Sequence, residues 1–153
     1  MKVPAPSFEV QTSIEIEASA DEVWQVLTEL EYYPAWNPMI TRASGDLAPG
    51  ARLHLRFETA GGRARDFRPR LLVVDPGREL RWLGNPSFPG LLVSEHYFRL
   101  GPTARGSCQV EHDMVFRGLL VPLLRSRADA ATRGRFEDMN AALKRRVETR
   151  EQD

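Results

Sequence analysis

Two histidines, His96 and His112, are the residues of this chain whose type and spacing most clearly allow chemistry. Each lies in a segment of alternating residues, LLVSEHYFRL or CQVEHDMVF, and the turn-forming residues 101–107 separate the two segments. An antiparallel hairpin whose paired residue numbers sum to about 208 places Leu100 opposite Cys108 and His96 opposite His112. The two imidazoles are therefore predicted to be neighbours on one face of a sheet.

The face of this hairpin that carries the histidines is otherwise apolar. It continues through Phe98, Met114 and Phe116, whereas the opposite face carries charged or polar residues, namely Arg99, Gln109, Glu111, Asp113 and Arg117. Because one face of an antiparallel sheet commonly packs on the core while the other meets water, the apolar face is predicted to point inward.

A histidine pair on an interior wall has several possible roles. It could orient a polar ligand group, transfer a proton or supply two metal ligands. Alternatively, both rings are core residues that hydrogen-bond to each other or to the backbone. A catalytic metal site usually needs a third protein ligand, and His54 alternates out of phase with Leu53 and Leu55. We therefore expect no metal and no cofactor.

Other residues share the predicted inward phase. In ELRWL, Leu80 and Trp82 alternate with charged residues, and Cys108 has the phase of a small buried residue rather than a nucleophile. Trp36 closes a short helical segment, and Asn37 after it is predicted to cap a helix end. Core packing is an equally open role for each aromatic residue. The candidate ligand contacts are Trp36, Leu80, Trp82, His96, Phe98, His112, Met114, Phe116, Phe136 and Met139, with His96 and His112 as the catalytic candidates.

The first forty residues predict a strand followed by helices. Residues 8–17 alternate with period two, and Ser19 with Glu22 three residues later forms a capping-box pattern that begins a helix. Pro34 and the Asn37-Pro38 pair limit this helical region, so a second short helical turn is predicted to end near Trp36.

Short strands separated by turns are predicted next, and then one long helix. The strands are residues 39–44, 52–58, 66–74, 79–83, 91–100 and 108–116, about seven with the first strand. Asp66 and Arg68 are predicted to lie on the surface, and basic residues 63–70 to form a solvated edge strand. Apolar residues at helical spacing predict a helix from about Pro122 to about Glu148.

Composition limits the possible functions. The chain has 153 residues, 42% of them hydrophobic, which indicates one domain over 1–153 with a core at about 8–148. Twenty-one basic and 21 acidic residues leave no excess cations for nucleic acid. The longest apolar stretch, 118–124, is too short for stable membrane insertion, and a secretory signal is not evident. With a single cysteine, these features predict a cytoplasmic protein.

Three segments carry a family resemblance: IEIEASADEVWQVLTELEYYPAWNPMI, PGRELRW and FRLGPTARGSCQVEHDMVFRG. They resemble the START/Bet v 1-like (SRPBCC) superfamily, and within it the polyketide cyclase/dehydrase-like branch. The resemblance implies an α+β helix-grip fold, in which a curved antiparallel sheet wraps around a long C-terminal helix and two short helices follow the first strand. It also implies a cavity for an apolar or amphipathic molecule, but no universal catalytic residue.

Three functions follow as hypotheses. The favoured one is a binding module for a small hydrophobic molecule, such as a lipid, a polyketide-like compound or an aromatic metabolite. The first alternative is a polyketide cyclase/dehydrase-type enzyme that uses His96 or His112 as acid or base. The second is a protein-interaction module, for which Phe88 could supply an exposed patch, although Phe88 as a lid over the cavity is the preferred interpretation. A monomer and a homodimer are both compatible with the neutral charge.

Overall fold

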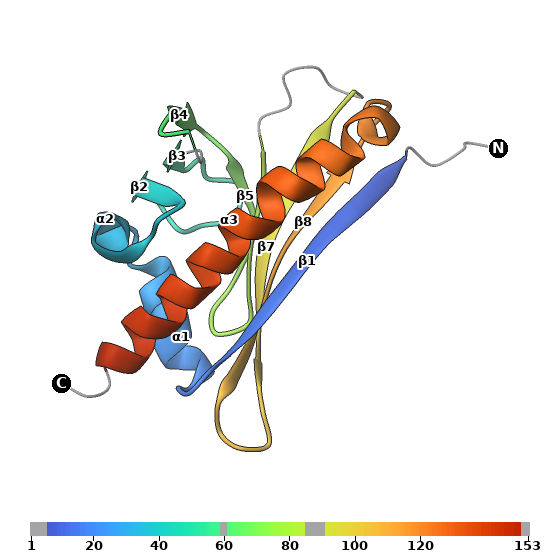
Figure 1. Ribbon diagram of the computed structural model, residues 1–153. Helices are drawn as coiled ribbons and strands as arrows, with labels where there is room; N and C mark the ends of the chain where they lie inside the picture. The colour runs from blue at the N-terminus through green and yellow to red at the C-terminus, as the bar shows by residue number, and fades with distance from the viewer. Residues whose placement is uncertain (1–5, 59–60, 85–90, 151–153) are drawn as a thin grey trace.

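In the computed structural model, which describes residues 6–58, 61–84 and 91–150, two antiparallel sheets lie against one long helix. The elements are β1 (Ser7–Ile16), α1 (Ala20–Thr28), the 3-10 turn η1 (Leu30–Tyr32), α2 (Tyr33–Trp36), β2 (Ile40–Ser44), β3 (His54–Glu58), β4 (Ala64–Phe67), β5 (Arg70–Asp75), β6 (Glu79–Leu83), β7 (Val93–Pro102), β8 (Cys108–Arg117) and α3 (Val121–Arg150). Helix α3 crosses the inner face of the larger sheet diagonally (Figure 1). This arrangement confirms the predicted α+β helix-grip architecture.

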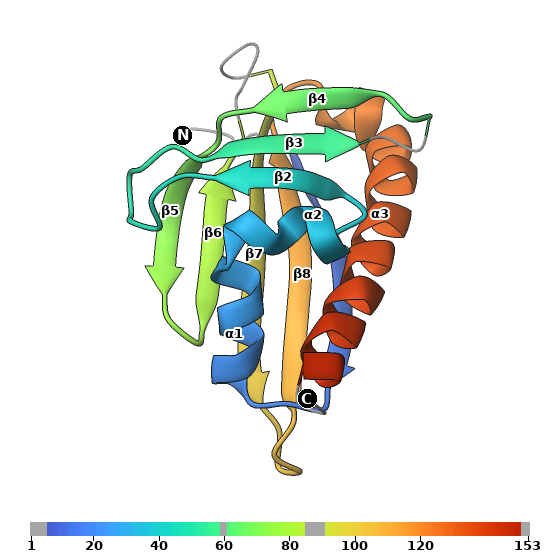
Figure 2. The same cartoon turned by 90° about the vertical axis from the view of Figure 1, so that its left-hand side faces the viewer.

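The strands form two sheets rather than one continuous sheet. The larger sheet has the order β1-β8-β7-β6-β5, and the smaller has the order β2-β3-β4. In Figure 2 the strands of the smaller sheet run across those of the larger one, and α1 and α2 lie below them. An isolated antiparallel β-bridge, a backbone pairing of Arg52 with Arg70, links the two sheets. The interior is therefore enclosed by both sheets and α3.

The strand count is a correction, because the described residues form eight strands and not about seven. The segment 66–74, predicted as one strand, is divided between β4 and β5. The break falls at Pro69, which has no N–H for a sheet hydrogen bond and whose carbonyl accepts from the Leu53 N–H (2.9 Å). At this residue the chain leaves the smaller sheet and enters the larger one.

The predicted start of α1 is confirmed. The Ser19 hydroxyl accepts the Glu22 N–H (3.2 Å), and the Glu22 carboxylate accepts the Ser19 N–H (3.2 Å), which completes the capping box. The second short helix ends at Trp36, as predicted. Asn37 follows it, and its Oδ1 accepts the N–H groups of Met39 and Ile40 (2.9 and 2.8 Å). The Asn37 side chain thus fixes the turn into β2 rather than the end of α2.

The register of the β7–β8 hairpin is a second correction. His96 lies opposite Met114, and Phe98 lies opposite His112, so the paired numbers sum to 210. The turn closes at Thr103, whose N–H donates to the Ser107 carbonyl (2.9 Å). Strand β7 therefore begins and ends two residues later than predicted, and β8 extends one residue further, to Arg117. Because the sum changes by an even number, every side chain stays on its predicted face. The two histidines are therefore neighbours as predicted, but they lie diagonally rather than directly opposite each other.

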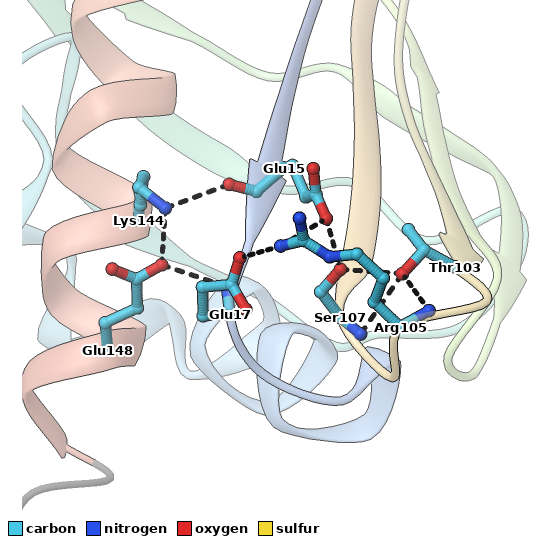
Figure 3. Close-up of polar contacts among 7 residues, drawn as sticks. All are labelled: Glu15, Glu17, Thr103, Arg105, Ser107, Lys144 and Glu148. Carbon is cyan, nitrogen blue, oxygen red and sulfur yellow. Dashed lines mark hydrogen bonds and ion pairs between the residues drawn. The ribbon is translucent and has the colours of Figure 1, made fainter.

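Polar contacts hold the C-terminal half of α3 against the end of β1 (Figure 3). Lys144 Nζ donates to the Glu15 carbonyl (3.0 Å) and to the Glu148 carboxylate (2.6 Å), which also accepts the Glu17 N–H (2.9 Å). Arg105 from the β7–β8 turn pairs with the Glu17 carboxylate (2.7 Å). These contacts tie helix, strand and hairpin together at one end of the molecule.

The Glu148→Gln variant should be less stable than the wild type by up to about 1 kcal/mol at neutral pH. The Lys144 ammonium and the Glu17 N–H lower the pKa of Glu148, so its carboxylate stabilises the fold above its unfolded-state pKa. This contribution is lost as the pH falls through the lowered folded-state pKa. Urea unfolding at neutral and acidic pH measures the difference, with Asp138→Asn, an exposed site on the same helix, as the control. An equal loss in both variants would contradict the prediction.

Candidate functional site

A cavity of about 650 Å³ lies between the inner face of β6–β8, the β3–β4 hairpin and α3. This volume is within the range of sites for small molecules. The apolar lining consists of Met39, Phe57, Phe67, Pro69, Trp82, Met114, Phe116, Ala131 and Phe136, together with Gly61 and Gly84. The polar lining consists of Glu58, Arg63, Arg65, Ser94, His96, Thr132 and Arg135.

Strand alternation directs these side chains into the cavity. Trp82 lies opposite His96, which in turn lies opposite Met114, so three adjacent strands of the larger sheet each contribute one side chain to the same row. On the smaller sheet, the Phe57 and Phe67 rings meet edge to face with centroids 5.0 Å apart. Two sheets therefore present aromatic surfaces to one space.

His96 and Phe136 form the floor of the cavity, and both pack on His112. The Nε2 atoms of His96 and His112 are 2.6 Å apart, and both side chains are buried. Phe136 from α3 stacks on His112 with centroids 3.8 Å apart, and on His96 with centroids 4.7 Å apart. His96 and Phe136 border the cavity, whereas His112 lies beneath them.

A chain of hydrogen bonds assigns the proton positions on both imidazoles. The Thr12 hydroxyl donates to the His112 carbonyl (2.5 Å), so it accepts from Asn140 Nδ2 (2.9 Å). The Asn140 amide therefore presents Oδ1 to His112 Nδ1 (2.8 Å), which must carry the proton. His112 Nε2 is then an acceptor, and His96 Nε2 donates to it. We call these four residues, Thr12, Asn140, His112 and His96, the histidine chain.

Both imidazoles are neutral at neutral pH. Burial lowers the pKa of His112 from 6.5 to about 3, although hydrogen bonds to the Asn140 side chain and the Phe136 backbone oppose this shift. Burial and the neighbouring His112 lower the pKa of His96 well below 6.5. His96 Nδ1 carries a lone pair in this tautomer and has no hydrogen-bond partner among the described residues. The histidine pair can thus orient a polar group or take part in proton transfer, although neither ring is charged at neutral pH.

The structure places the ten predicted contact residues in two groups. Those that border the cavity are Trp82, His96, Met114, Phe116 and Phe136. Those that do not border it are Trp36, Leu80, Phe98, His112 and Met139. The last four are buried in the core, and Trp36 packs edge to face on Tyr33 with centroids 5.2 Å apart. Strand phase identifies the inner face but not the depth at which the core ends and the cavity begins.

The sequence interpretation missed the cavity residues of the β3–β4 hairpin. The predicted solvated edge strand over 63–70 is confirmed in part, because β4 is an edge strand of the smaller sheet and Arg65 is exposed. Arg65 also lies opposite Phe57 and two residues before Phe67, however, so it shares their inner face and lines the cavity. That common phase is the signal that could have identified it. Asp66 and His54 are exposed, as predicted, on the other face.

Three further expectations concern individual residues and the membrane. Cys108 is buried in the core, as predicted, and burial raises the pKa of its thiol. Phe88 lies outside the described residues. Over the part of the chain that the structure describes, no helix is long and apolar enough to cross a membrane.

Comparison with known sequences identifies one protein family. A model described as "Polyketide cyclase / dehydrase and lipid transport" matches residues 7–148 of the chain. The curated protein sequences include no significant match.

Comparison with solved structures shows the same fold at low sequence identity. The di-domain ARO/CYC StfQ from the steffimycin biosynthetic pathway has a TM-score of 0.77 and 14% identity over 96% of this chain and 53% of its own, so this chain spans about half its length. The ZhuI aromatase/cyclase from Streptomyces sp. R1128 has a TM-score of 0.76 and 17% identity over 95% and 96% of the two chains. Norcoclaurine synthase from Thalictrum flavum, in complex with dopamine and hydroxybenzaldehyde, has a TM-score of 0.73 and 15% identity over 95% and 89%.

Imidazole nitrogen NMR should find the proton of His112 on Nδ1 and the proton of His96 on Nε2. Both rings should remain neutral well below pH 6.5, the ordinary pKa of histidine, because burial lowers the pKa of each ring. A His112 ring protonated on Nε2 alone, or a charged ring at neutral pH, would contradict the assigned histidine chain.

Proposed function

This chain belongs to the polyketide cyclase/dehydrase and lipid transport family, and we propose that it binds a small apolar or amphipathic molecule in the cavity between its sheets and α3. The observation that carries the proposal is the cavity itself, which is large enough for such a molecule and is lined mainly by aromatic and aliphatic side chains. Transfer of an apolar molecule from water to this lining is favourable in proportion to the apolar area removed from water.

The aromatic floor favours a ligand with a flat, unsaturated body. Trp82 and Phe136 present ring surfaces on either side of His96, with Trp82 and His96 centroids 4.5 Å apart. Ring stacking adds to the free energy of area burial when centroids lie within a few ångströms. Norcoclaurine synthase, which shares the fold, is named as a complex with two small aromatic molecules. The neutral charge and single cysteine support a cytoplasmic location.

A cyclase/dehydrase-type enzyme is the second candidate, favoured by the position of His96. Its neutral imidazole borders the cavity, and its Nε2–H donates to His112 Nε2 at the start of the histidine chain. A substrate held above the floor would meet a group able to exchange a proton, while the cavity walls restrict its conformation. The low pKa of His96 makes it a weak base, so this candidate ranks second.

Ala131→Phe should weaken binding of the fluorescent probe N-phenyl-1-naphthylamine about tenfold, because the added ring occupies cavity volume. Ala131 and the adjacent Ala130 are both exposed on α3, but only Ala131 lines the cavity. Ala130→Phe should therefore bind the probe like the wild type. Fluorescence titration measures both affinities. Failure of the wild type to bind the probe, or equal affinity in both variants, would overturn the proposed binding site.

His96→Phe separates the two candidate functions. In a carrier, this variant should alter probe affinity by a small factor only, because Phe keeps the aromatic floor. In an enzyme, it should abolish cyclisation of a poly-β-ketone thioester while the probe still binds. Product analysis by mass spectrometry makes the distinction, and wild-type protein that forms no cyclised product would remove the enzyme candidate for this substrate class.

A further inference from the structure

Three arginines are among the polar residues that line the cavity. Arg63 and Arg65 come from the β3–β4 hairpin and Arg135 comes from α3. We call these three residues the arginine rim. Arg63 and Arg65 are exposed as well as lining the cavity, so they lie where the cavity meets solvent. Glu58 is the single carboxylate among the lining residues described, which leaves a net charge of +2 with His96 neutral.

Arg65 occupies an unusual position for a surface arginine. It lies opposite Phe57 and two residues before Phe67, on the face of the smaller sheet that points into the cavity. Among the described residues it has no ion pair. Arg42 and Arg70 of other strands likewise have no ion pair among the described residues, whereas Arg56, Arg81, Arg99, Arg105 and Arg117 have carboxylate partners. Arg65 differs from all of these in that it lines the cavity.

Arg135 is held in place but is not neutralised. Its Nη2 donates to the Pro38 carbonyl (3.1 Å) and to the Glu58 carbonyl. Both acceptors are backbone oxygens, so the guanidinium keeps its full charge at a fixed place between α3 and the smaller sheet. A guanidinium presents five N–H donors, and these two contacts leave others free.

An apolar ligand that covered these arginines would remove water from their charges without replacing it. The cost of such desolvation is offset when an opposite charge of matching geometry binds at the same place. Planar guanidinium groups match carboxylates in two-point hydrogen bonds, which are stronger than bonds between neutral groups. An acidic group at the rim is therefore the complement of this lining.

We propose that the ligand is an amphipathic carboxylate, whose acidic group binds Arg65 and its neighbours of the arginine rim while its apolar body lies on the aromatic floor. This inference rests on the proposed binding function and adds the charge and the orientation of the ligand. The acid faces solvent at the hairpin side, and the apolar end points toward His96 and Phe136.

Displacement of N-phenyl-1-naphthylamine by two matched compounds tests the inference. Dodecanoate and dodecan-1-ol have the same chain length, but the head group of dodecanoate is a charged carboxylate and that of dodecan-1-ol is a neutral hydroxyl. Arg65→Gln should weaken dodecanoate binding about tenfold, equivalent to about 1.4 kcal/mol, and should leave dodecanol unchanged. Arg65→Lys, which keeps the charge but loses the planar guanidinium, should bind dodecanoate with an affinity between those of the wild type and Arg65→Gln. Higher salt should weaken only dodecanoate.

Arg145→Gln is the control for a general change in net charge, because Arg145 is exposed on α3 and does not line the cavity. It should leave both compounds unchanged. If the probe binds but Arg65→Gln affects neither compound, or affects both equally, the carboxylate inference is overturned while the binding function stands. If the probe and both compounds fail to bind the wild type, the proposed function and the inference are both overturned.

Discussion

The buried contact between His96 and His112 is the interaction on which the interior depends. Two imidazoles with Nε2 atoms 2.6 Å apart require one donor and one acceptor, so the accepting ring is neutral. Burial lowers the pKa of both rings, so the donating ring is neutral as well and the two rings are opposite tautomers. Asn140 and Thr12 meet this requirement, and they connect α3, β1, β8 and β7 in one hydrogen-bonded chain. An unsatisfied donor at this depth costs about 1–3 kcal/mol, so the chain favours a single arrangement of helix and sheet.

The histidine chain also marks the boundary between two different halves of the interior. On the side of α1, buried apolar residues such as Leu27, Leu143 and Phe98 pack together as the core. On the other side, the smaller sheet stands across the larger one (Figure 2), and the space between them holds the cavity. The polar cluster around Lys144 closes the filled end (Figure 3), so the open end is the one free to receive a ligand.

Local patterns in the sequence predicted most of the elements, because capping and periodicity act over a few residues. The Ser19–Glu22 capping box and the long C-terminal helix are examples. Non-local features were harder to predict. The break at Pro69 depends on two sheets meeting, and the β7–β8 register depends on how its turn closes. Arg65 was assigned to a solvated edge, because nothing in residues 63–70 alone shows that Phe57 lies opposite.

Methyl NMR of the methionines, during titration with N-phenyl-1-naphthylamine, tests the central claim most directly. Met39 and Met114 border the cavity, whereas Met139 is buried in the core and does not. A molecule in the cavity should therefore shift the Met39 and Met114 methyl signals and leave that of Met139 nearly unchanged. Saturation with the probe while neither Met39 nor Met114 responds would show that binding occurs elsewhere, and would contradict the account.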